Sequence, residues 1–179
     1  MSIEIKEVKT SSDLKVFYQF QNKLYRNCAQ YVPSLDMDQK STLTEDPALE
    51  YCVRKMWLAY KGGEVVGRIQ AVVNPRYNEF YNLKRVRFGW FDFVEDFNVA
   101  KALLDTAMAW GKEQGMTEVH GPLFYNTLGK QGMLVDGFEK GNKLKFHESQ
   151  RNAIINAALA SCARSNGTND LANTSYVQF

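Results

Sequence analysis

Two adjacent glycines between two strand-like runs place the tightest constraint on how this chain can fold. The runs 56–60 and 65–73 are rich in β-branched and aromatic residues, which favour extended backbone. Between them, Gly62 and Gly63 can take the positive φ values that a two-residue hairpin turn requires. The block therefore predicts a tight antiparallel hairpin.

A further strand and a long helix follow the hairpin. The segment 85–94 has strand character, and either Asp96 or Asn98 can cap the helix after it. Gly115 stands where a left-handed C-terminal cap belongs, and 117–123 is the next strand. The apolar face of the helix is predicted to contain Val99, Ala102, Leu103, Ala107 and Trp110. A strand–helix–strand unit crosses over right-handedly and makes its two strands parallel, so the pattern predicts an α/β (α+β) core in which an antiparallel meander leads into one parallel pair.

The region before the hairpin predicts one short strand and several helical segments. Apolar residues within 3–8 fit the strand, and a helix is expected from Leu14 to near Cys28. A second short helix is expected over 36–44. Pro47 fits the first position of a further helical turn.

The composition argues against several classes of protein. The net charge is +2, from 22 basic and 20 acidic residues, which predicts neither a nucleic-acid partner nor a membrane partner. No run approaches the roughly 20 apolar residues of a membrane span. The three cysteines form no Cys-x-x-Cys pair, and no metal-ligand spacing occurs. We therefore expect a cytoplasmic protein with reduced thiols and no metal.

Several strings together resemble the GNAT superfamily of N-acetyltransferases. They look most like a group of bacterial GNAT-like proteins, most of which have no assigned substrate. The strings are Arg76-Tyr77-Asn78, Arg85-Val86-Arg87-Phe88-Gly89-Trp90-Phe91-Asp92-Phe93, Ala102-Leu103-Leu104-Asp105, Gly121-Pro122-Leu123 and Gly132-Met133-Leu134-Val135-Asp136-Gly137-Phe138. The resemblance covers roughly residues 3–139 and implies a mixed, mainly antiparallel sheet flanked by helices.

The resemblance also divides the chain into two parts. Residues 1–139 are expected to form an incomplete acyl-CoA N-acyltransferase core, and 140–179 a divergent tail. Residues 142–163 could form one helix there, followed by disorder. The C-terminal part of the fold would then be missing or replaced, either by truncation or frame shift of the reading frame or because the chain is a shortened relative.

The resemblance implies acetyl-CoA as a substrate and names the residues that would bind it. These are Phe91, Asp92, Phe93, Val94, Asn98, Val99 and Asn126. The backbone of the first four would polarise the thioester carbonyl. In active GNAT enzymes a glycine-containing loop binds the pyrophosphate at the start of the following helix. Here the segment 95–100 has no glycine and carries two carboxylates, Glu95 and Asp96. They favour helix capping, with a catalytic role for Glu95 as the alternative.

Other candidate residues each have a simpler structural interpretation. Tyr125 could hydrogen-bond the cofactor or protonate a thiolate, but packing of a loop is favoured. His120 is expected to be a core or edge histidine, and Cys52 a buried structural thiol. Arg85 and Arg87 could contact phosphates, although alternating arginines more often face solvent.

Two functions remain open from the sequence. The first is a GNAT-like N-acetyltransferase, active or truncated and inactive, which would transfer the acetyl group of acetyl-CoA to an amine whose identity the residues do not reveal. The second is a non-catalytic GNAT-like module that binds a ligand or a protein partner, and the missing glycines and the short C-terminus favour it. An open sheet edge would also permit a homodimer. Whether the chain is an enzyme is not decided by its residues.

Overall fold

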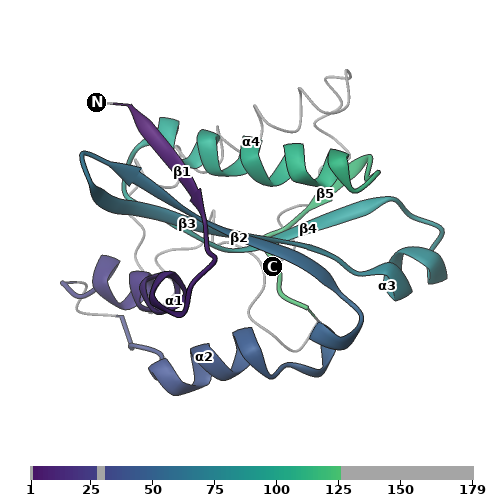
Figure 1. Ribbon diagram of the computed structural model, residues 1–179, viewed down its shortest axis with the longest axis horizontal. Helices are drawn as coiled ribbons and strands as arrows, with labels where there is room; N and C mark the ends of the chain where they lie inside the picture. The colour runs from purple at the N-terminus through teal and green to yellow at the C-terminus, as the bar shows by residue number, and fades with distance from the viewer. Residues whose placement is uncertain (1, 28–30, 126–179) are drawn as a thin grey trace, which may run out of the picture.

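A computed structural model describes residues 2–27 and 31–125, which form a five-stranded sheet between two layers of helices (Figure 1). In chain order the elements are β1 (Ile3–Glu7), α1 (Ser11–Leu24), α2 (Asp36–Thr44), the 3₁₀ helix η1 (Pro47–Glu50), β2 (Val53–Lys61), β3 (Glu64–Val73), α3 (Pro75–Phe80), β4 (Arg85–Phe93), α4 (Phe97–Glu113) and β5 (Glu118–His120). The expected tail 140–179, with its helix 142–163, lies outside the described residues, so the division at residue 139 stays a prediction.

The sheet has the mixed, mainly antiparallel pairing that the sequence predicts. Its strand order is β1-β2-β3-β4-β5. The first four strands are antiparallel neighbours, and β4 and β5 form the one parallel pair. The turn between β2 and β3 has positive φ at Gly62 (61°) and Gly63 (84°). A two-residue hairpin turn requires these values, and glycine can adopt them. The fold class is confirmed.

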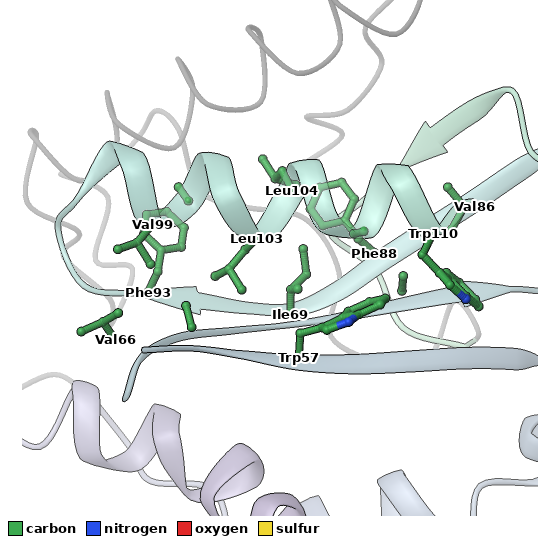
Figure 2. Packing of buried hydrophobic residues seen from close by; sticks show 14 of the residues in the cluster. Trp57, Val66, Ile69, Val86, Phe88, Phe93, Val99, Leu103, Leu104 and Trp110 are labelled. Atoms are coloured by element: carbon green, nitrogen blue, oxygen red, sulfur yellow. The ribbon is translucent and has the colours of Figure 1, made fainter. Parts of the chain in front are cut away.

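One face of the sheet is covered by α4, and the layer between them is apolar. Figure 2 shows side chains of α4 and of the strands meeting there, among them Ile69, Phe88 and Leu103. Leu103 is fully buried. The helix lies so close to β4 that a Cβ on Gly111 would come within 2.5 Å of Val86 Cγ1. The predicted apolar face is correct for Val99, Leu103, Ala107 and Trp110, whereas Ala102 is half-buried.

The opposite face is covered by α1 and α2 (Figure 1). Thr10 caps α1: its hydroxyl accepts the Asp13 N–H (3.1 Å), and the Asp13 carboxylate accepts the Thr10 N–H (2.9 Å). Phe17 of α1 and Leu43 of α2 are fully buried and belong to one apolar cluster with Trp90 of β4. This second layer contains both apolar and charged groups.

Three details differ from the sequence-based predictions. α1 ends at Leu24 rather than near Cys28, and β5 is shorter than 117–123. The helix α3 has no counterpart among the predicted elements, because Asn74 and Pro75 also suit the end of a strand. In the structure the Asn74 side chain caps α3 by accepting the Tyr77 N–H (2.9 Å), and Pro75 occupies its first turn.

Among residues 2–27 and 31–125, no helix has the length and apolar character needed to cross a bilayer.

Candidate functional site

The candidate site lies along β4, at the point where the chain after β5 leaves the sheet edge. β5 pairs with only the first three residues of β4. The Leu123 N–H then donates to the Phe88 carbonyl (2.8 Å), and a Cβ on Gly89 would lie 2.5 Å from the Leu123 carbonyl oxygen. The next residue, Phe124, stacks on Trp90 with 4.9 Å between ring centroids. Within the described residues, no strand pairs with this edge of β4 beyond Phe88.

A bulge in β4 lies beside this edge. The register between β3 and β4 runs from Gln70↔Gly89 to Arg68↔Asp92, so β4 has one more residue than β3 in the interval. Trp90, within the bulge, has φ 48°, a left-handed value that is rare for a large side chain. Bulges often lie next to functional sites because they redirect the backbone.

The strand geometry fixes where the backbone groups of the later part of β4 point. The Val94 N–H donates to the Val66 carbonyl of β3 (2.8 Å). Since backbone groups alternate sides along a strand, those of Asp92 also point to β3. The N–H groups of Phe91 and Phe93 therefore point toward the edge that no described strand covers.

Beneath the bulge, Arg68 of β3 and Asp92 of β4 form a buried ion pair. Arg68 is 1% exposed, and its Nε and Nη2 lie 2.8 and 2.6 Å from Asp92 Oδ2. Its Nη1 donates to the Phe17 carbonyl of α1 (2.7 Å), and its guanidinium lies over the Trp90 ring, 4.8 Å from the centroid. Most guanidinium donors are thus satisfied, which a buried charge requires.

A polar network connects this ion pair to α1 and α2. The Gln21 side chain donates to Asp92 Oδ1 (3.3 Å). The next residue, Asn22, donates to Asp36 Oδ1 (3.3 Å) and accepts a hydrogen bond from the Tyr31 hydroxyl (2.6 Å). Burial, with the nearby Asp92 charge, raises the pKa of Tyr31. The network holds α1 over the bulge. Asp92 therefore has a structural role, through its bonds to Arg68 and Gln21, whether or not it also binds a ligand.

The start of α4 is built to cap the helix. Asp96 Oδ1 accepts the Asn98 N–H (2.9 Å), and Oδ2 pairs with Lys61 Nζ (2.8 Å). The hydrogen bond from Lys61 is the main cause that lowers the pKa of Asp96. Glu95 and Asn98 are exposed, and Val99 is fully buried in the α4 core. The capping interpretation is confirmed for Asp96, while the catalytic role of Glu95 and the cofactor contacts of Asn98 and Val99 stay predictions.

Tyr125 lies on the face of the sheet opposite α4, where it packs against Val72 and Ala48. It is 2% exposed, and its hydroxyl accepts hydrogen bonds from Arg54 Nη1 (2.7 Å) and Gln70 Nε2 (2.8 Å). Burial is the main cause that raises its pKa. The placement favours the packing interpretation, and its proposed role as a proton donor stays a prediction. Asn126 lies outside the described residues.

His120 and Cys52 have shifted pKa values with structural causes. Burial, helped by Arg85 and Arg87, lowers the pKa of His120 to about 4, so its ring is neutral at pH 7. Burial also raises the pKa of the Cys52 thiol to about 11, which suppresses the reactive thiolate. In the part of the chain that the structure describes, no group of three or more His, Cys, Asp or Glu side chains could hold a metal ion.

Sequence reasoning missed Arg68, although a signal for it was present. Arg68 lies within the strongly apolar run 65–73, and Asp92 lies within the aromatic run 88–93. A charge in the middle of a buried strand requires a counter-charge, and these two are the obvious partners. The interpretation of Asp92 through its backbone alone overlooked this pairing.

Two curated bacterial proteins are similar to this chain, and no family model matches it. Protein YghO of Escherichia coli (strain K12) is 33% identical over 129 residues, which are 72% of this chain and 33% of that protein. The bacterial ceramide synthase of Caulobacter vibrioides (strain NA1000 / CB15N) is 28% identical over 137 residues, 74% of this chain and 35% of that enzyme. The chain spans about a third of the length of each relative.

Solved GNAT structures are also similar, at low identity. A GNAT-family acetyltransferase from Staphylococcus aureus Mu50 is 18% identical, with 69% of this chain and 75% of that chain covered and a TM-score of 0.49. A tandem GNAT protein from the clavulanic acid biosynthesis pathway is 15% identical, with 63% and 34% covered and a TM-score of 0.48. The strand order and mixed pairing described above are those that the resemblance to the superfamily implies, and the fold is GNAT-like in this sense.

Proposed function

We propose that this chain is part of an N-acyltransferase of the GNAT type, which transfers an acyl group from a thioester to an amine. The observation that carries the proposal is the edge of β4 beyond Phe88, where the N–H groups of Phe91 and Phe93 have no strand partner among the described residues. Unpartnered N–H groups along a strand edge can hold the amide and carbonyl groups of an extended ligand, as an added strand would.

The proposed reaction needs few groups from the protein. The amine nitrogen attacks the thioester carbonyl, a C–N bond forms and the C–S bond breaks. The departing thiolate takes up a proton, and the amine loses one. A backbone N–H at Phe91 or Phe93 would stabilise the negative charge that develops on the carbonyl oxygen. The Arg68–Asp92 pair would hold the bulge in the shape that presents these N–H groups.

The amine class is supported by one of the relatives. A ceramide contains an amide bond, so a ceramide synthase joins an acyl group to an amine nitrogen. The 28% identity with that enzyme extends over 74% of this chain. We therefore propose an amine acceptor, with acetyl-CoA or a longer acyl-CoA as the donor.

The residues fit the two ends of acyl-CoA unequally. The open edge of β4 fits the acyl and pantetheine end, which carries amide groups. The start of α4 does not fit the pyrophosphate, because the Asp96 carboxylate already accepts the Asn98 N–H there and Glu95 adds a second charge. This mismatch favours the second candidate, a non-catalytic module that binds a ligand along the same edge.

Calorimetric titration of the full chain with acetyl-CoA and with a longer soluble acyl-CoA tests binding. We expect saturable binding by wild type. In an assay of thiol release with an amine present, we expect about a hundredfold lower rate for Phe91→Pro, which removes the proposed N–H donor. Phe91→Ala is the matched control, because it removes the same ring and keeps the N–H. Equal behaviour of the two variants, or no binding at millimolar acyl-CoA, would refute the proposal.

Release of free thiol in the presence of a panel of amines separates the two candidates. Thiol release that depends on the amine supports the transferase. Binding without any release, across short and long-chain amines, supports the non-catalytic module instead.

A further inference from the structure

The five described arginines from Arg54 to Arg87 fall into two groups by their partners. Arg68 and Arg85 each pair with a carboxylate, Asp92 and Glu118. The ion pairs among residues 2–27 and 31–125 include none that involves Arg54, Arg76 or Arg87. We call these three residues the arginine cluster. They lie where β2 begins, β3 finishes and β4 begins, the end of the sheet that carries α3 in Figure 1.

Two members of the cluster meet at Tyr125. Arg54 Nη1 donates to the Tyr125 hydroxyl (2.7 Å), and Arg87 Nη1 donates to the Tyr125 carbonyl (3.2 Å). The second amino group of Arg54 donates to the Leu43 carbonyl (2.5 Å). All of these acceptors are neutral, so they orient the guanidinium groups, and neither positive charge has a carboxylate partner among the described residues.

The third member and the surrounding tyrosines complete the cluster. The guanidinium of Arg76 lies 4.1 Å from the centroid of the Tyr51 ring, and that of Arg87 lies 4.0 Å from the Tyr77 ring. Stacking on aromatic rings holds guanidinium planes and leaves their edges available to hydrogen-bond an oxyanion. Tyr51, on which Arg76 stacks, packs against the buried cluster of Ala48, Val72 and Tyr125, so all three arginines lie around one part of the core.

Asp46 is a carboxylate near this region, but it forms no ion pair with the three arginines among the described residues. Asp46 Oδ1 accepts the Ala48 N–H (2.8 Å) and caps η1. Arg87 is 7% exposed, and a buried cation without a counter-charge is costly. Arg76 is exposed on α3, so one of these two cations is in contact with solvent and the other is buried.

We infer that the arginine cluster binds the oxyanion group of a ligand, a phosphate or a carboxylate, with Arg87 and Arg76 as its main contacts. Planar guanidinium groups bind both oxyanions through paired, charge-assisted hydrogen bonds. The site does not rest on the proposed acyl transfer. Arg87 precedes Phe91 by four residues, about 13 Å along a strand, so this site and the β4 edge are separate places in the fold.

Titration of the full chain with inorganic phosphate, followed by ³¹P NMR and by thermal unfolding at constant ionic strength, tests the inference. Acetate serves as the carboxylate probe, and chloride as the control for ionic strength. We expect phosphate or acetate, but not chloride, to raise the melting temperature. Arg87→Met should weaken that binding about tenfold or more. Arg85→Gln is the matched control on the same strand, and should leave the affinity unchanged.

Arg76→Gln keeps the test decisive if Arg87→Met does not fold, because Arg76 is exposed. We expect this variant to weaken phosphate or acetate binding several-fold with an unchanged melting temperature in chloride. A response to chloride equal to that of phosphate and acetate would overturn the inference. Equal affinities in wild type, Arg76→Gln and Arg87→Met would overturn it as well.

Discussion

Arg68 and Arg87 are buried to nearly the same degree on neighbouring strands, yet their surroundings differ in kind. Arg68 is 1% exposed and has a carboxylate, Asp92, within 2.8 Å. Arg87 is 7% exposed and has a carbonyl and an aromatic ring instead. The first arrangement satisfies a charge within the fold, as a structural ion pair does. The second orients a charge that meets no carboxylate among the described residues, which is typical of a binding group.

The largest expected effect comes from breaking the neutralised pair. Arg68→Met leaves the Asp92 carboxylate buried without a cation, and should reduce the free energy of unfolding by about 3–5 kcal/mol. Urea denaturation of the full chain measures this loss. The double variant Arg68→Met with Asp92→Leu is the control, and should recover most of the stability, because no buried charge remains. A double variant no more stable than the single one would show that the pair does more than neutralise charge.

The next largest effect is expected at Tyr125, whose hydroxyl accepts a hydrogen bond from Arg54 of the arginine cluster. Tyr125→Phe removes the hydroxyl that accepts hydrogen bonds from Arg54 and Gln70, and leaves the half-buried Arg54 and the buried Gln70 without that acceptor. We expect a loss of about 2 kcal/mol in urea denaturation. Tyr81→Phe is the control, since Tyr81 is 56% exposed and should change stability little. If Tyr125→Phe kept full stability but lost acyl transfer, the packing interpretation would be wrong.

The partly exposed ion pair between Lys61 and Asp96 is a third case. Its loss should change stability by an amount between those expected for the Arg68 and Arg87 variants. Asp96 caps α4 and pairs with Lys61, so Asp96→Ala should cost about 1 kcal/mol at pH 7. The folded pKa of Asp96 is below its usual 3.8, so the unfolded chain takes up the proton first as the pH falls. The stabilisation is therefore present above pH 3.8 and disappears as the pH falls through the folded pKa.

Urea denaturation of wild type and Asp96→Ala at several pH values from 7 downward measures this effect. Glu95→Ala is the matched control, because Glu95 is an exposed neighbouring carboxylate, and its change should stay within about 0.5 kcal/mol. A stability difference between wild type and Asp96→Ala that did not shrink in acid would contradict the assigned role of the cap.

The parts of the fold that sequence predicts well are those with local causes. The turn at Gly62 and Gly63 needs positive φ, which glycine provides. Pro47 begins a helical turn because its fixed φ suits that position. The crossover through α4 follows from chirality, so the sequence pattern predicts the parallel pairing of β4 and β5.

The candidate site depends on contacts between residues far apart in the chain, and these could not be predicted in the same way. Arg68 and Asp92 are 24 positions apart, and Arg54 and Tyr125 are 71 apart. Their meeting depends on the bulge at Trp90 and on the turn of the chain onto the α1 face after Leu123. Neither feature has a local sequence signal, so Tyr125 could be considered catalytic until its place in the core was known.

The smallest expected effect is the one that distinguishes the two arginines most directly. Arg87→Met removes a cation that has no carboxylate partner in the described residues, so no buried anion is left behind. The lost hydrogen bond to the Tyr125 carbonyl is offset by relief from burying the charge. We expect a change of less than about 1 kcal/mol in chloride buffer, against the large loss in Arg68→Met. Urea denaturation of the two variants side by side measures the difference. A loss in Arg87→Met as large as that in Arg68→Met would mean that Arg87 is neutralised within the folded chain and would remove the distinction between the two arginines.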